Sequence, residues 1–110
     1  MGQRATPPFQ FPPVTRRSEE RLEVDLSCDA RFEAGRTRAM RIQNVSRSGL
    51  LLSWSSGMNE TLTAGQTVEV FTTLRGQRYV VRGRVVRTHN AVGAQTIGVG
   101  HAKWYQLENV

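Results

Sequence analysis

The chain of 110 residues is poor in several residue types, and each scarcity excludes a class of protein. Cys28 is its only cysteine, so no disulfide can form within the chain, and a reducing, cytoplasmic setting is expected. There is no run of about 18 apolar residues, so no membrane-spanning helix is predicted. The length suits one domain built around one hydrophobic core.

Side chains that build active sites are also scarce. The two histidines, His89 and His101, lie far apart, and no Cys, His or Asp spacing resembles a metal site. Only three carboxylates follow residue 33, namely Glu60, Glu69 and Glu108. The serines lie in no nucleophile-elbow pattern. We therefore expect a binding protein and not an enzyme, with no metal and no cofactor.

What the chain does have is positive charge, almost all of it arginine. The net charge is +6, and Lys103 is the only lysine among 15 basic residues. Arginine presents a planar fork that binds phosphate and guanine edges in a bidentate manner, whereas lysine is a point charge. A phosphate-bearing or nucleotide partner is one interpretation; a GC-rich genome, whose codons favour arginine, is the other.

The distribution of proline and of apolar residues divides the chain into two parts. Residues 1–15 hold all four prolines and no alternating pattern, which predicts a flexible N-terminal arm. Residues 16–110 are expected to form the domain. Apolar and polar residues alternate there in short runs, at about 22–28, 40–43, 50–54, 68–72, 79–86 and 97–99. Such runs predict an all-β barrel or sandwich, and the tail 102–110 is expected to form a short helix.

Two polar stretches stand out against this pattern. Asn44, Ser46 and Gly49 precede the apolar run that starts at Leu50. They offer an amide, a hydroxyl and a position without a Cβ, which together suit a nucleotide base and its phosphate. A plain turn has the same composition.

The second stretch lies before the first expected strand. Arg17 and Arg21 are four residues apart, and Arg16 adjoins them. Their guanidinium groups would be able to close over an anion held at the barrel surface. Alternatively, Glu19 and Glu20 neutralise them in a solvated helical turn.

Taken together, Arg17-x-x-x-Arg21 and Asn44-x-Ser46-x-x-Gly49 resemble the two-part signature of the PilZ domain family. The resemblance extends over about 16–100 and includes the stretches "GQTVEVF" and "VRGRVVR". It implies a six-stranded antiparallel β-barrel and a bacterial receptor for the second messenger cyclic di-GMP. Such a receptor relays the level of the messenger to a partner protein in motility, polysaccharide or virulence control.

The resemblance also implies roles for individual residues. Arg17 and Arg21 would clamp phosphates and guanine edges, Asn44 and Ser46 would bond a guanine or a phosphate, and Gly49 would leave room for the ligand. Arg16 is a further candidate, because a second, stacked dinucleotide would need another cation nearby. The chain departs from the family where Gly98-Val99-Gly100-His101 replaces the usual Gly-Val-x-Phe, and Trp104 is the aromatic residue that would fill the gap.

Two alternatives remain open. A small basic β-barrel that binds RNA or single-stranded DNA would use the stacking ring of Tyr79 and four arginines on the same hairpin, namely Arg78, Arg82, Arg84 and Arg87. These arginines would equally form the solvated face of an amphipathic strand. A PilZ-like adaptor that no longer binds the nucleotide is the second alternative, and the intact signature argues against it.

Overall fold

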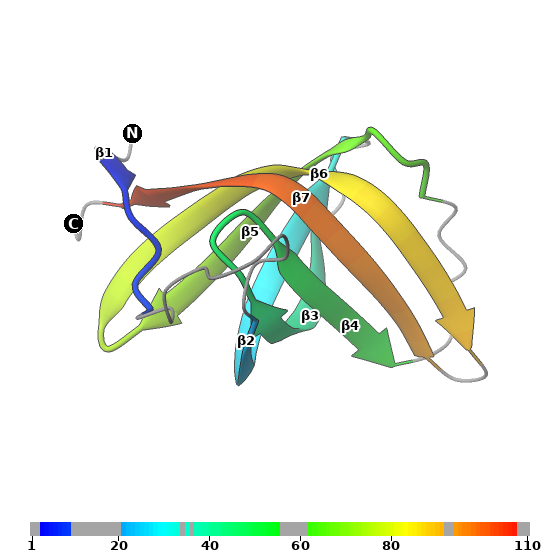
Figure 1. Cartoon of the computed structure of the whole chain (residues 1–110), viewed down its shortest axis with the longest axis horizontal. Coiled ribbons are helices and arrows are strands. Elements are labelled where there is room, and N and C mark those ends of the chain that lie inside the picture. Colours follow the sequence, from blue (N-terminus) through cyan, green and yellow to red (C-terminus); the bar gives the residue numbers. More distant parts are fainter. Residues whose placement is uncertain are drawn as a thin grey trace.

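The computed structural model describes residues 3–9, 21–33, 35, 37–55, 62–91 and 94–107. All regular elements in these ranges are strands (Figure 1): β1 Gln3–Ala5, β2 Leu22–Phe32, β3 Thr37–Val45, β4 Leu50–Ser55, β5 Thr67–Leu74, β6 Gln77–Ala91 and β7 Ala94–Gln106. Among these residues no helix has the length and apolar character needed to cross a membrane.

The strands form one sheet that closes on itself. Neighbours follow the order β1-β7-β4-β3-β2-β5-β6, and β6 pairs again with β7 to complete the barrel. Every pairing is antiparallel. The long strands β6 and β7 arch side by side over the shorter ones, and β1 lies along the C-terminal end of β7 (Figure 1). The predicted six-stranded antiparallel barrel is confirmed, with one short strand added.

The alternation in the sequence places one side of each strand in the core. In β2, for example, Cys28, Ala30 and Phe32 are buried while the residues between them are exposed. Trp104 of β7 is 1% exposed, and its ring packs edge-on against Tyr79 and Phe9, with centroids 5.8 and 5.7 Å away. Trp104 therefore supplies a large aromatic ring to the core near the end of β7.

Two expectations about the ends of the chain differ from the structure. The predicted helix over 102–110 is wrong for 102–106, which continue β7, because their backbone pairs with β6 on one side and with β1 on the other. In the predicted N-terminal arm, residues 3–5 form strand β1, and Phe9 packs on Trp104. The flexibility of the arm stays a prediction, and 10–15 lie outside the described residues.

Candidate functional site

A bulge in β3 turns Asn44 away from the core. Met40 and Ile42 face the interior, and strict alternation would place Asn44 there as well. The pairing of β3 with β4 shifts register between Ile42 and Asn44, so that Val45 takes the next core position with 0% exposure. Bulges commonly re-aim a side chain in this way. Asn44 is left half-buried at the outer end of the strand.

Arg21, the last arginine of the RxxxR stretch, reaches Asn44 from the start of β2. Residue Glu23 lies opposite Asn44 in the β2–β3 ladder, and Arg21 is two residues before it. The Arg21 Nη1 group donates a hydrogen bond of 2.9 Å to Asn44 Oδ1. Both side chains are accessible to solvent. Two motifs that are 23 residues apart in sequence therefore meet at one end of the barrel.

The loop between β3 and β4 is fixed by two backbone hydrogen bonds. Ser46 N donates to Gly49 O at 2.9 Å, which closes the loop. Ala102 N of β7 donates to Ser48 O at 2.8 Å, which ties the loop to the neighbouring strand. Ser46 is 3% exposed and Gly49 is buried. The polar entry to β4 is thus an ordered loop held against the barrel wall.

Gly49 has a packing reason to be glycine. A Cβ at this position would lie 2.7 Å from Val99 O and 3.5 Å from Ser46 Oγ. The Val99 carbonyl belongs to the backbone of β7, so it cannot move aside as the end of a flexible side chain would. The resemblance implied that Gly49 leaves room for a ligand; the structure shows that its lack of a Cβ lets the loop approach β7.

A second bulge, in β7, brings the backbone of that strand to the loop. His101 has a φ of +54°, and the β6–β7 register shifts between Arg82 and Arg84. Gly83 faces this bulge, and a Cβ there would lie 2.7 Å from Val99 Cγ1 and 2.8 Å from Gly100 O. The sequence reasoning missed this support for the loop. The signal was present, because glycine inside a strand often marks a bulge or a close backbone approach.

The remaining predicted site residues, Arg16 and Arg17, lie outside the described residues. Arg41, which was not a predicted site residue, lies farther along β3 and is already bound to Asp25 Oδ1 at 2.5 Å and to Ser27 Oγ at 3.2 Å. The hydrogen bond from Arg41 also lowers the pKa of Asp25 below its ordinary value. The described residues contain no group of three or more His, Cys, Asp or Glu that could hold a metal.

Tyr79, which the nucleic-acid alternative would use to stack on a base, does not lie on the same side of its hairpin as the exposed arginines. The ring of Tyr79 is half-buried and packs against Trp104, with 5.8 Å between the ring centroids. Arg82 and Arg84 on the same strand are exposed. Tyr79 therefore belongs to the packing around the core, whereas these arginines face solvent.

Comparison with known proteins agrees with this geometry. The family model described as "PilZ domain" matches residues 15–102, which include both motifs and all six barrel strands in whole or in large part. The chain belongs to the PilZ domain family. PilZ domains are binding and adaptor domains for cyclic di-GMP. None of the curated protein sequences compared matches the chain.

Two solved structures share the PilZ fold with this chain. The Bacillus subtilis inhibitor of motility, MotI/DgrA, superposes with a TM-score of 0.62 at 14% identity, over 88% of this chain and 45% of that one. This PilZ domain thus spans less than half of that protein. The PilZ domain of the cellulose synthase CeSA from a cellulose-synthesizing bacterium gives a TM-score of 0.58 at 16% identity, over 82% of this chain and 83% of that domain.

Proposed function

We propose that this PilZ domain is a bacterial, cytoplasmic cyclic di-GMP receptor without catalytic activity, which relays the level of the messenger to a partner protein. The process under control would be motility, polysaccharide synthesis or virulence. The observation that carries the proposal is the hydrogen bond between Arg21 and Asn44, because it joins the two halves of the PilZ signature at one end of the barrel.

The chemistry of the site suits a guanine dinucleotide. Arg21 has a fork of N–H donors, and arginine bonds guanine O6 and N7 or a phosphate in a bidentate manner. Its contact with Asn44 is exposed and has a neutral acceptor, so a phosphate, which forms a stronger charge-assisted bond, would compete for the same donors. Asn44 and Ser46 would then bond the ligand from the barrel side, on the loop that Gly49 allows to lie against β7.

Arg17 would complete the phosphate clamp from the segment before β2. Arg16 is proposed to serve a second dinucleotide stacked on the first, since two stacked molecules carry four phosphate charges. If so, titration of the wild type approaches two dinucleotides per chain, and Arg16→Ala falls to one with the first site retained. A wild-type ratio of one at saturation would remove this role from Arg16.

Isothermal titration calorimetry of the whole chain tests the receptor proposal. Cyclic di-GMP should bind with saturation, whereas GTP and a short single-stranded oligonucleotide at the same ionic strength should bind far more weakly. Equal affinity for the oligonucleotide would favour the nucleic-acid alternative. No saturable binding of cyclic di-GMP would support an adaptor that has lost the nucleotide.

A further inference from the structure

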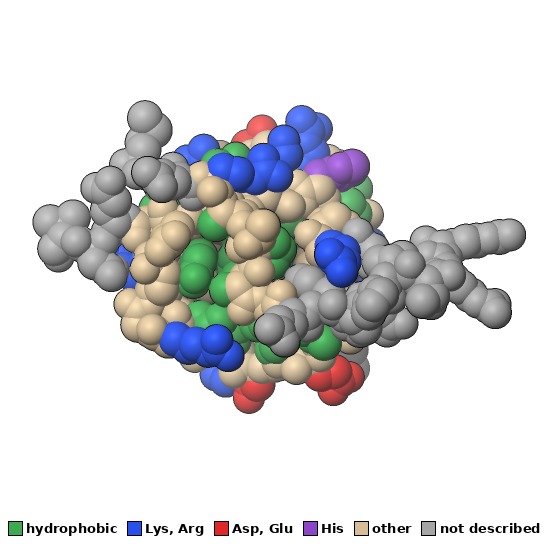
Figure 2. All heavy atoms as spheres, turned by 60° about the vertical axis from the view of Figure 1, so that its left-hand side comes forward, with side chains coloured by type: hydrophobic (Ala, Val, Ile, Leu, Met, Phe, Trp, Pro, Cys, Tyr) green, Lys and Arg blue, Asp and Glu red, His purple; other side chains and the backbone are tan. Residues whose placement is uncertain are grey.

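Positive charge is spread over the molecule, so charge alone does not select a second binding surface. On the face shown in Figure 2, Lys and Arg side chains lie at several separate places, and apolar side chains are visible between the backbone segments near the middle. One region differs in sequence. The two longest strands, β6 and β7, contain five Lys or Arg residues and no Asp or Glu: Arg78, Arg82, Arg84, Arg87 and Lys103.

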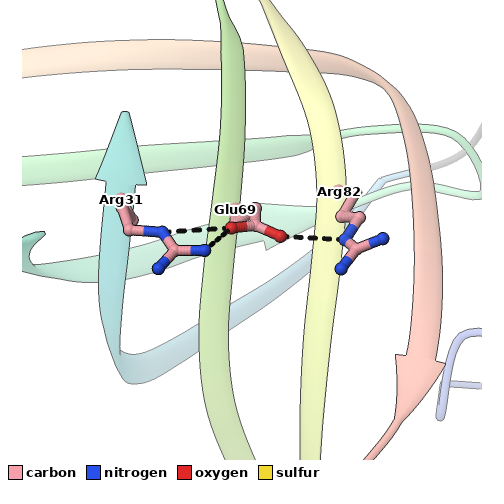
Figure 3. A network of polar contacts seen from close by, with 3 residues as sticks. All are labelled: Arg31, Glu69 and Arg82. Carbon is pink, nitrogen blue, oxygen red and sulfur yellow. Dashed lines mark hydrogen bonds and ion pairs between the residues drawn. The ribbon is translucent and has the colours of Figure 1, made fainter. Parts of the chain in front are cut away.

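An ion-pair row crosses the outer side of the barrel at this region. Arg31 of β2, Glu69 of β5 and Arg82 of β6 lie opposite one another in the ladders. Arg31 bonds Glu69 Oε1 through Nε and Nη2, and Arg82 Nε bonds Glu69 Oε2 at 2.9 Å (Figure 3). The hydrogen bond from Arg31 is the main cause that holds the pKa of Glu69 below its ordinary value, and the hydrogen bond from Arg82 acts in the same direction. One carboxylate thus orients two guanidinium groups.

A short apolar row lies next to the ion pairs. Phe71, Val80 and Tyr105 are opposite one another on β5, β6 and β7. Val80 is 4% exposed. It lies between Tyr79 and Val81, which pack on the interior core, so alternation along β6 places its side chain on the outer side of the barrel. The Arg31 guanidinium lies 5.8 Å from the Phe71 ring centroid, and that of Arg82 lies 5.3 Å from the Tyr105 centroid. The arginines therefore cover this apolar row.

The same surface keeps hydrogen-bonding capacity and space for an outside group. Arg82 uses only Nε in its bond to Glu69, and its side chain is 59% exposed. A hollow of about 560 Å³ adjoins Arg31, Glu69 and Arg82, with Glu33 and Val68 also in its lining. Across the ladder from Arg82 stands the exposed Lys103. The Nη groups of Arg82 are thus placed to take a carboxylate on the β6–β7 side.

We propose that the outer face centred on Arg82 is a docking surface for an acidic segment of a partner protein. Charge complementarity supports an acidic partner, because β6 and β7 carry only cations. A protein segment is favoured over single-stranded nucleic acid because the rings of Phe71 and Tyr105 already carry guanidinium groups where bases would stack.

This docking surface does not depend on nucleotide binding, and it can be tested separately. The probe is a short synthetic peptide of alternating glutamate and serine with one central leucine, titrated into the whole chain and followed by backbone amide shifts. Saturable shifts should centre on the residues around Arg82. Arg82→Ser should weaken peptide binding about tenfold, the loss expected for a charge-assisted hydrogen bond. Glu69→Gln should tighten binding, because it removes the internal carboxylate that competes for both arginines.

The matched control is Arg87→Ser, which removes an exposed arginine from the same strand at a position outside the ion-pair row. It should weaken peptide binding far less than Arg82→Ser does, because it removes only one distant charge. Equal weakening by Arg82→Ser and Arg87→Ser would mean non-specific attraction and would overturn the proposal. So would tighter binding of an oligothymidylate than of the peptide at this face. Arg82→Ser should leave the cyclic di-GMP titration unchanged, so failure here and failure of the receptor proposal are distinguishable.

Discussion

Replacing Gly49 with alanine should damage both the barrel and the proposed nucleotide site. The added Cβ would lie 2.7 Å from Val99 O, closer than van der Waals contact permits. Val99 cannot retreat, because it is paired with Leu50 of β4 on one side and with Val85 of β6 on the other. The loop must therefore move away from β7, which strains the bond between Ser48 O and Ala102 N.

The size of the effect follows from overpacking of a well-packed region. Such insertions cost about 1–3 kcal/mol of the free energy of unfolding. For a chain of this length that corresponds to a fall in Tm of roughly 4–12 °C, measurable by differential scanning calorimetry. Because Ser46 belongs to the displaced loop and Asn44 lies next to it, the affinity for cyclic di-GMP should fall as well.

Gly35→Ala is the control for a general effect of replacing glycine. Gly35 has a φ of +87°, and apart from its own atoms and those of its two chain neighbours none lies within 4 Å of where its Cβ would be, so alanine there adds backbone strain without a tertiary clash. It should lower the free energy of unfolding by the left-handed backbone penalty alone, about 1–2 kcal/mol, and leave nucleotide affinity unchanged. An unaltered Tm and affinity in Gly49→Ala would refute the role given to this close contact.

Two further predictions concern titratable groups. Burial raises the pKa of the Cys28 thiol to about 12, so the folded protein should react with a disulfide reagent near neutral pH only after denaturant is added; fast reaction of the native chain would contradict its burial. The pKa of Glu69 is lowered by Arg31 and Arg82, so its ion pairs stabilise the fold above the ordinary value of 4.5 and this contribution is lost as pH falls through the lowered folded pKa. When the pH is lowered from about 6 to about 3, the Tm of Glu69→Gln should therefore fall less than the Tm of the wild type. An equal fall would show that the Glu69 carboxylate does not contribute to stability.

The sequence was sufficient to predict much of the fold, because most strands bury one face and their apolar and polar residues therefore alternate. The PilZ signature also grouped Asn44 with Arg21, two side chains that the structure brings into contact. The sequence did not predict the bulge in β3, since that bulge depends on which strand lies opposite and not on the local pattern. For the same reason Val45, and not Asn44, enters the core. The bulge in β7 did have a local signal, the glycine Gly83 inside β6, which the sequence reasoning did not use.

The ends of the chain show the same limit. Ala102 and Trp104 alternate with polar residues, yet so short a run also fits one face of a helix, and only pairing with β6 decides for a strand. The three residues of β1 are too few for any periodic signal, and they are strand because β7 offers a free edge. Tyr79 contacts the core because its ring packs against Trp104, a residue 25 positions away in sequence whose place the local pattern does not give.

The most direct test of the receptor account is calorimetric titration of cyclic di-GMP into Arg21→Ala, with Arg75→Ala as the control. Arg75 is an exposed arginine in the turn between β5 and β6, whereas Arg21 precedes β2 and bonds Asn44 of β3. Loss of a charge-assisted contact, about 1.5–3 kcal/mol, predicts that Arg21→Ala binds more than about tenfold more weakly. Its Tm should hardly change, because the side chain is exposed, and Arg75→Ala should bind as the wild type does. Wild-type affinity in Arg21→Ala would contradict the proposal that the contact between Arg21 and Asn44 marks the nucleotide site.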